Sequence, residues 1–492
     1  MQNVSHVKEL FAHTIVYGLG IILNKSLNFI LLPVYTKYFT PEEVGLFTLV
    51  YSLMLFTGII YTFGLETSFI RFFIDSENES EKNEYYSSSI ASLFITSIIF
   101  SIFIYIYSES ISGFFHFDNP AGSTIMIKLA SIYMIIDTVC RFPLLLFRAK
   151  LDTRNFSLLN LITFISNLAS NIVLIVILKQ GVESIFYCMI FSSAITLLAG
   201  LLMTRRYLTL RISVIKIKTL FNYGYKFIFT GIFLILIEMS DRFFLKYFFS
   251  EGIVGIYSAN YRLASVMGLA ISAFRFSWTP YFFNLKNNPE NKKIISSVFT
   301  YFMFAGLMLF LLISLTADQL VRIDILGFSL LDGKFRSGTG ILPLVLLSYL
   351  FSGIYSVFNA APFLNDKTSQ ILIMALSGFI INTLFNLLLI PDHGIYGAAA
   401  ATLITYAVMT LIVFYYSQKI YKIEYQWIKI AVMSLIALLI FITGYFIIDR
   451  IMLPDMFKIL INILLVILSF SIMNLFKIID LKKVSILWRK TH

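Results

Sequence analysis

The chain has 492 residues, of which 58% are hydrophobic and 13% are charged, and its mean hydropathy is +0.84. Soluble domains carry about 25% charged residues, so this chain has too little polar surface to cover a soluble fold. The net charge of +11 is better explained by basic loops on one side of a membrane than by a nucleic-acid partner. The composition predicts an all-α integral membrane protein and excludes a soluble enzyme.

Fourteen apolar stretches follow one another along the chain, and each is long enough to cross a bilayer. A transmembrane helix needs about 20 mostly apolar residues, whereas barrel strands are half that length and alternate in polarity. The predicted helices are 11–32, 44–68, 87–108, 123–147, 156–178, 182–203, 222–248, 253–278, 294–316, 338–360, 369–390, 395–416, 428–448 and 456–477.

The basic residues of the loops give the orientation. Residues within two positions of a span end are counted with the adjoining loop. On this count, 23 of the 38 Lys and Arg residues fall in alternate loops from the N-terminus, eight fall in the other loops, and seven lie deeper within the predicted helices. Lys and Arg accumulate in cytoplasmic loops. This bias predicts cytoplasmic termini and an even number of spans.

The two halves of the chain are similar to each other. Three sets of matching positions keep their order at offsets of 209 to 215 residues. They are Lys37-Tyr38-Phe39 and Gly45 with Lys246-Tyr247-Phe248 and Gly255, Asn167 and Asn171 with Asn382 and Asn386, and Gly181 with Gly394. They predict an internal repeat of six helices, whose two copies share one orientation in the membrane because six is even. Two such lobes around a central cavity form a transporter architecture.

The predicted division of the chain follows this repeat. Residues 1–203 form an N-terminal six-helix lobe and 204–221 form a cytoplasmic linker. A C-terminal six-helix lobe spans 222–418, and 419–492 hold two additional transmembrane helices with a basic cytoplasmic tail.

Ionisable residues inside predicted spans are the candidates for function, because a charge at membrane depth costs about 2.5–3.5 kcal/mol. They are Lys25, Lys128, Arg141, Lys226, Arg242, Arg262, Arg275, Glu66, Asp137, Glu238 and Asp241. Lys128 and Lys226 lie near span ends, where a long side chain reaches the interface. Asp137 and Arg141 are four residues apart, and a structural intrahelical pair is the favoured interpretation. Glu238 and Arg242 have the same spacing.

The remaining charges predict an anion site. Arg262 and Arg275 lie on a polar stripe along the helix 253–278, which is interpreted as lining a water-filled cavity together with the helix 44–68. Lys25, Arg242 and Arg262 lie about 9–14 Å inside the outer face, from the helical rise of 1.5 Å per residue. Lys and Arg bind phosphate groups, so Lys25, Arg242, Arg262 and Arg275 are the predicted substrate-binding residues.

The acidic residues Glu66, Glu238 and Asp241 are predicted to compensate these charges or to couple transport to an ion gradient. A carboxyl whose pKa is raised by burial can take up a proton. The alternative interpretation is that Glu238 and Asp241 only neutralise the neighbouring Arg242.

The sequence predicts no cofactor, metal or catalytic residue. Cys140 and Cys188 lie in apolar stretches and the five His residues are scattered. The segment from Gly327 to Phe335 departs from a phosphate-binding loop, with five residues between its glycines and Phe where Ser or Thr binds magnesium. A proton gradient, a sodium gradient or the membrane potential is therefore the predicted driver.

Two loop motifs carry a resemblance to a known family. The run Lys37-Tyr38-Phe39-Thr40-Pro41-Glu42-Glu43-Val44-Gly45 and the run Pro391-Asp392-His393-Gly394-Ile395-Tyr396-Gly397 resemble loops of bacterial polysaccharide transporters. These belong to the superfamily of multidrug, oligosaccharidyl-lipid and polysaccharide exporters. The resemblance implies flipping of an undecaprenyl-diphosphate-linked oligosaccharide across the bacterial inner membrane by alternating access, for O-antigen or capsule synthesis.

The resemblance also implies partners and leaves alternatives open. The expected partners are the lipid-linked glycan, the lipid bilayer, and polysaccharide polymerase and chain-length proteins. A lipid II-type flippase or a multidrug antiporter of the same fold remains open. A membrane glycan polymerase or glycosyltransferase is the alternative from another class, and the missing catalytic motifs disfavour it.

Overall fold

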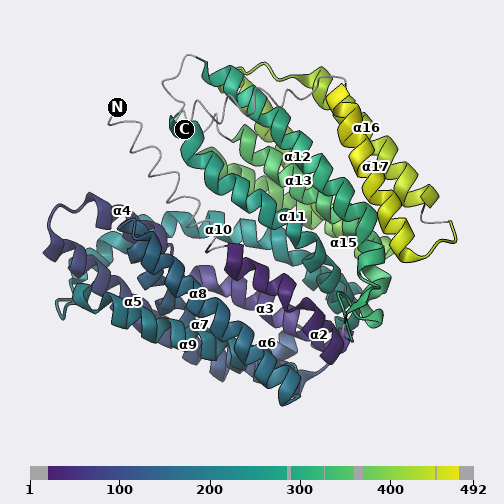
Figure 1. The fold of residues 1–492 in the computed structure, drawn as a ribbon. Coiled ribbons are helices and arrows are strands. Elements are labelled where there is room, and N and C mark those ends of the chain that lie inside the picture. Colours follow the sequence, from purple (N-terminus) through teal and green to yellow (C-terminus); the bar gives the residue numbers. More distant parts are fainter. Residues whose placement is uncertain are drawn as a thin grey trace. The chain divides into compact units, whose positions relative to one another are not determined.

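A computed structural model describes residues 20, 22–284, 290–325, 327–359, 369–448 and 451–475, and these residues are almost entirely helical (Figure 1). The strands in this part of the chain are the two-residue pair β1 (Asp324–Ile325) and β2 (Phe328–Ser329), which lie antiparallel. The first predicted span, 11–32, lies partly outside the described residues, and the basic tail after 477 lies wholly outside them.

The helices follow the predicted spans closely. In chain order they are α2 (Leu32–Tyr38), α3 (Pro41–Thr62), α4 (Leu65–Asp75), α5 (Glu79–Ile106), α6 (Ser108–Phe114), α7 (Pro120–Ala149), α8 (Thr153–Asn171), η1 (Ile172–Ile177), α9 (Ser184–Thr204), η2 (Arg205–Tyr207), α10 (Val214–Phe248), α11 (Glu251–Asn284), α12 (Asn291–Leu320), η3 (Gly333–Ile341), α13 (Leu342–Phe358), α15 (Ser369–Ile420), α16 (Trp427–Ile442), η4 (Thr443–Ile448) and α17 (Asp455–Leu475).

Eleven helices among the described residues are long and apolar enough to cross a membrane. One of them, Leu372–Ile420, is 49 residues long. It is interrupted at Gly394, whose φ of 53° is non-helical, and the predicted spans 369–390 and 395–416 lie on either side of this break. The prediction of an all-α, multi-pass membrane protein is confirmed.

The contacts within the chain divide it into two compact units. Among the described residues, the first unit holds 20–259 and 375–398, and the second holds 260–374 and 399–475. The predicted lobes follow the sequence repeat, whereas these units follow spatial contacts, so the predicted lobe boundaries stay a prediction.

Helix α5 shows how the first unit is adapted to lipid. Its exposed positions include Ile95, Ile99, Ile102 and Ile106, which recur at helical spacing on one side. Its buried positions are largely serines, among them Ser88, Ser89, Ser92, Ser97 and Ser101. Small residues let membrane helices approach closely, while apolar side chains are stable against lipid tails. The polarity of α5 is therefore the reverse of that in a soluble helix.

Ion pairs mark one end of the first unit. Lys216, at the start of α10, contacts Glu84 of α5 at 2.7 Å. Lys150, after α7, contacts Glu79 at 3.4 Å and lies 4.1 Å from the ring centre of Tyr207, which follows α9. The turns after α7 and α9 therefore lie at the same end as the start of α5. These turns belong to the loops that are rich in Lys and Arg.

The first turns of α3 and α11, which correspond in the sequence repeat, pack against each other with their backbones in contact. A Cβ atom added to Gly45 of α3 would lie 1.8 Å from the carbonyl oxygen of Glu251, and one added to Gly255 of α11 would lie 1.9 Å from that of Pro41. Both distances are far below van der Waals contact, so only glycine fits at either position. The matching glycines of the sequence repeat thus serve one close helix crossing within the first unit.

In the second unit, the two C-terminal helices pack on α12. The side-chain amide of Asn462 in α17 donates a hydrogen bond of 2.5 Å to the carbonyl oxygen of Leu315 in α12. Gly444 of η4 lies close to α12 as well, because a Cβ atom added to it would lie 2.6 Å from the Leu315 side chain. A buried amide contact of this kind fixes the register of α17 against α12.

Candidate functional site

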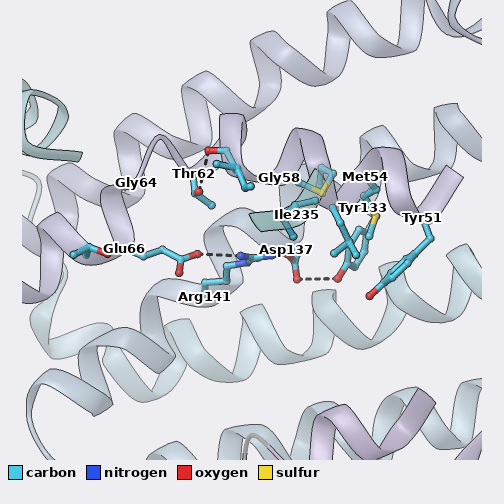
Figure 2. Close-up of a pocket in the computed structure, with 14 residues that line it drawn as sticks. Tyr51, Met54, Gly58, Thr62, Gly64, Glu66, Tyr133, Asp137, Arg141 and Ile235 are labelled. Carbon is cyan, nitrogen blue, oxygen red and sulfur yellow. Dashed lines mark hydrogen bonds and ion pairs between the residues drawn. The ribbon is translucent and has the colours of Figure 1, made fainter. Parts of the chain in front are cut away.

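The first unit contains a cavity of about 320 Å³ between its helices (Figure 2). Its lining residues come from α3, α4, α7 and α10, and they are Tyr51, Met54, Leu55, Gly58, Ile59, Thr62, Gly64, Glu66, Thr67, Tyr133, Met134, Asp137, Arg141 and Ile235. Binding pockets for small molecules are mostly apolar, with a few placed polar groups. This cavity is more polar, because seven of its 14 lining residues have polar or charged side chains.

A charged network centred on Arg141 crosses the cavity. The Arg141 guanidinium donates from Nη1 to Glu66 Oε1 at 3.0 Å, and from Nε and Nη2 to Asp137 Oδ2 at 3.0 and 2.7 Å. The Tyr133 hydroxyl donates to Asp137 Oδ1 at 2.9 Å. Such charge-assisted bonds are the stronger class of protein hydrogen bonds. The network therefore holds Arg141 in one orientation.

A break between α3 and α4 brings Glu66 to this network. Phe63 and Gly64 both have positive φ, at 49° and 67°, and α4 begins at Leu65. A Cβ added to Gly64 would lie 2.2 Å from the carbonyl oxygen of Gly224 in α10, so this position also requires glycine. The break starts a new helical turn whose second residue is Glu66, and this carboxylate reaches Arg141.

The three charged side chains keep accessible surface. Arg141 is 42% exposed, Glu66 is 36% exposed and Asp137 is 17% exposed. Each charge has a partner of opposite sign, and each still faces open space in the cavity (Figure 2). Accessible charges at membrane depth require water or a polar ligand beside them, because hydrocarbon does not solvate them.

Arg242 lies in a different environment. Its guanidinium donates to Asp241 Oδ1 at 2.7 Å and to the backbone carbonyl of Glu238 at 2.6 Å. Asp241 also accepts a hydrogen bond of 2.5 Å from the Tyr257 hydroxyl. The Arg242 and Asp241 side chains are 6% and 1% exposed. Arg242 thus has a side-chain partner in its sequence neighbour Asp241, while the exposed Glu238 contributes its carbonyl oxygen.

The other predicted substrate-binding residues are distributed over both units. Lys25 is an exposed residue of the first unit, and Arg262 is a partly buried residue of α11 in the second unit. Arg275 bonds to Ser352 of α13, with 2.6 Å between its Nη2 atom and the Ser352 carbonyl oxygen. The predicted joint anion site of Lys25, Arg242 and Arg262 stays a prediction.

Sequence reasoning found Glu66 but not its role as a partner of Arg141. The spacing of Asp137 and Arg141 predicted an intrahelical ion pair, and the structure contains this pair. The Phe63-Gly64 pair was the sequence signal for a helix break before Glu66, since a glycine can end one helix and let the next begin at a different angle. Among the described residues, no group of three or more His, Cys, Asp or Glu side chains is placed to hold a metal ion.

The sequence matches a family of glycan-related proteins. Residues 10–286, more than half of the 492, match the model of a family described as polysaccharide biosynthesis protein. A protein named probable low-salt glycan biosynthesis flippase, from Haloferax volcanii, is 20% identical over 414 residues, which cover 83% of this chain and 84% of that protein. A capsular polysaccharide biosynthesis protein of Staphylococcus aureus is 22% identical over 418 residues, covering 81% and 97%.

Solved membrane transporters share the fold. The lipid II flippase MurJ, in an inward closed conformation, superposes with a TM-score of 0.75 at 17% identity, covering 94% of this chain and 98% of that one. An inward-facing multidrug resistance transporter of the MATE family superposes with a TM-score of 0.68 at 12% identity, covering 81% and 97%. At these identities the likeness establishes the fold, which is the fold predicted from the sequence.

Proposed function

The chain belongs to the polysaccharide biosynthesis protein family, and on that premise we propose that it is a flippase for a lipid-linked glycan. Its substrate is an undecaprenyl-diphosphate-linked oligosaccharide, which it moves across the bacterial cytoplasmic membrane by alternating access. The product supplies the assembly of a surface polysaccharide of the O-antigen or capsule type. Both termini face the cytoplasm, and polymerase and chain-length proteins act on the translocated product.

The observation that carries this proposal is the charged network of Arg141, Glu66 and Asp137, which opens into a cavity between membrane helices. Charged groups with accessible surface at membrane depth are characteristic of a pathway for polar substrates. The names of the two relatives, a glycan flippase and a capsular polysaccharide protein, support the same substrate class.

We assign the diphosphate contact to Arg262. Its guanidinium suits a phosphate group geometrically, because a planar fork of N–H donors matches two phosphate oxygens. Arg262 is partly exposed, whereas Arg242 is buried against Asp241. Lys25 and Arg275 stay candidate substrate-binding residues in this proposal, whereas the charge of Arg242 is balanced by Asp241. The polyprenyl tail stays in lipid.

An ion gradient or the membrane potential drives the cycle in this proposal, without a cofactor. Glu66, Glu238 and Asp241 are the candidate coupling carboxylates. Glu238 is exposed and Glu66 is partly exposed, so both can exchange an ion with solvent. Asp241 is 1% exposed and bonded to Arg242 and Tyr257, which favours a charge-compensating role for it.

Surface glycan export in cells that lack the native gene tests the proposal. Arg262→Ala should reduce export by about ten- to a hundredfold, since a charge-assisted bond contributes about 1.5–3 kcal/mol. Arg262→Lys should restore part of the export because it keeps the charge but loses the fork.

Lys128→Ala is the control for this experiment, because Lys128 lies 5.3 Å from the ring centre of Tyr105 near a helix end. It should export normally. Normal export by Arg262→Ala, at wild-type protein levels, would remove the diphosphate assignment. Longer glycan chains made by the purified protein would favour a polymerase instead.

A further inference from the structure

The cavity in the first unit has two chemically different ends. Figure 2 shows Glu66, Arg141 and Asp137 in a row, followed by the rings of Tyr133 and Tyr51. The charged end offers both donors and acceptors, because carboxylates only accept hydrogen bonds and a guanidinium only donates them. The other end is aromatic. A ligand that fills the cavity must therefore match a polar edge and an apolar face.

The charges of the network discriminate between classes of ligand. A small anion would meet Glu66 and Asp137, and a small cation would meet Arg141, which already occupies the position between the two carboxylates. A neutral ligand with many hydroxyl groups avoids both repulsions, because each hydroxyl donates to a carboxylate or accepts from the guanidinium. The network thus favours a neutral polyol.

The network also has spare hydrogen-bonding capacity for such a ligand. A guanidinium has five N–H donors, and three of those of Arg141 are used in the bonds to Glu66 and Asp137. Glu66 accepts through Oε1 in its bond from Arg141, and its side chain remains 36% exposed. Two donors and a carboxylate oxygen are then available to one ligand at the charged end.

The volume of the cavity and its aromatic end restrict the class of ligand further. A cavity of about 320 Å³ lies at the lower end of the range for small-molecule pockets, roughly 300–1,000 Å³, so it fits one ring-sized molecule. A sugar ring has hydroxyls at its edge and C–H groups on its faces. Aromatic side chains such as Tyr51 and Tyr133 can pack against an apolar face of this kind.

We propose that this cavity binds one neutral pyranose ring of the lipid-linked glycan, with hydroxyls on Glu66, Asp137 and Arg141 and one face on the tyrosine rings. The proposal rests on the proposed flippase function and adds a sugar subsite to it. It differs from the diphosphate contact, which Arg262 of the second unit supplies.

Lipids that co-purify with the full-length protein from its own cells test this subsite. Mass spectrometry would give the ratio of sugar-bearing to bare polyprenyl diphosphate on the wild type and on the variants Tyr51→Leu and Glu66→Gln. We expect Glu66→Gln to lower this ratio by about tenfold or more, as for the loss of one charge-assisted bond. Tyr51→Leu should lower it by about two- to tenfold, as for the loss of one aromatic contact. Total polyprenyl diphosphate should stay at the wild-type level.

Two further variants keep the test interpretable. Tyr133→Phe preserves the ring and removes only the hydroxyl that bonds to Asp137, so it should fold and lower the ratio less than Tyr51→Leu. Tyr105→Leu is the matched control, because Tyr105 is 46% exposed and does not line the cavity. It should leave the ratio unchanged.

Three outcomes would overturn the sugar subsite. An unchanged ratio in both Tyr51→Leu and Glu66→Gln would show that the cavity does not hold the sugar. An unchanged ratio with an altered proton or sodium dependence of transport in Glu66→Gln would make it an ion site. If the wild type retains no polyprenyl diphosphate lipid, the proposed function fails and the subsite fails with it.

Discussion

Two arginines of the first unit, Arg141 and Arg242, both pair with an aspartate of their own helix, yet their surroundings differ. The Arg242 side chain is 6% exposed, and its partner Asp241 is 1% exposed. The Arg141 side chain is 42% exposed in a cavity, and it binds Glu66 of another helix besides Asp137. Arg242 therefore belongs to a buried structural ion pair, while Arg141 is an accessible side chain that two carboxylates hold in one orientation.

The difference shows that spacing along a helix does not separate structural pairs from sites. The buried pair stabilises its surroundings, because removing one partner would leave the other charge in a low-dielectric interior. The accessible network has solvent or ligand beside it, so its loss changes binding more than folding. A substitution of Arg242 should therefore reduce the amount of folded protein, whereas a substitution of Arg141 should reduce transport.

Arg242→Ala should have the largest effect. It leaves the Asp241 carboxylate buried without its cation, which costs about 3–5 kcal/mol. We expect little folded protein in the membrane, measured by fluorescence-detected gel filtration. Adding Asp241→Asn to this variant should restore much of the yield, since the buried charge is then gone. Wild-type yield from Arg242→Ala alone would contradict the comparison.

Arg141→Ala should fold and fail in transport. Glu66 and Asp137 keep access to water in the cavity, so the yield should fall far less than for Arg242→Ala. Glycan export should fall by about ten- to a hundredfold, because the charge-assisted contacts are lost. A yield as low as that of Arg242→Ala would show that Arg141 is also structural.

Arg71→Ala is the matched control for Arg141→Ala. Arg71 and Asp75 are also four residues apart, at 3.6 Å, but they are 51% and 62% exposed. Exposed pairs of this kind contribute about 0–1 kcal/mol. Yield and export should both stay near the wild-type values. A large loss of export would indicate that charge anywhere in this unit affects transport.

Asp118→Asn should have a small effect that depends on pH. Asp118 lies in the loop before α7 and bonds to Lys246 and to the backbone N–H of Glu251. Partial burial pushes the pKa of Asp118 up, but the bonds from Lys246 and Glu251 and the charge of Lys246 together hold it below its ordinary value. The ionised carboxyl thus stabilises the folded state above the ordinary pKa, and this contribution is lost as pH falls through the lowered pKa.

The measurement for Asp118→Asn is thermal unfolding of the purified variant and the wild type at several pH values. The variant should unfold at a lower temperature at pH 7, and the difference should shrink below about pH 4. A difference that is independent of pH would mean that the carboxylate charge of Asp118 does not contribute to stability.

The membrane fold could be predicted from the sequence because its physical cause is local. Each span is a run of apolar residues, and the boundary at Gly394 was placed correctly by its turn residues. The matching glycines Gly45 and Gly255 were visible as a repeat. Their mutual packing was not, because a close approach between segments about 210 residues apart leaves no local signal.

The candidate site could be predicted only in part. The cost of a charge in lipid identified Glu66, Asp137 and Arg141 as unusual residues. Which carboxylate meets which arginine depends on how α3, α4 and α7 cross, and the sequence does not contain those angles. The positive φ at Phe63 and Gly64 decides that Glu66 reaches Arg141.

Reconstituted transport tests the central claim, that this chain flips a lipid-linked glycan, most directly. The purified protein would be placed in vesicles that carry an undecaprenyl-diphosphate-linked oligosaccharide in both leaflets. A glycosidase added outside then digests the outer-leaflet glycans and, as flipping continues, those that arrive from the inner leaflet. The account predicts nearly complete digestion with the wild type and about half with protein-free vesicles. With Arg262→Ala, digestion beyond half should be about ten- to a hundredfold slower. Digestion that stops at half with the folded wild type, under an imposed proton, sodium or electrical gradient, would contradict it.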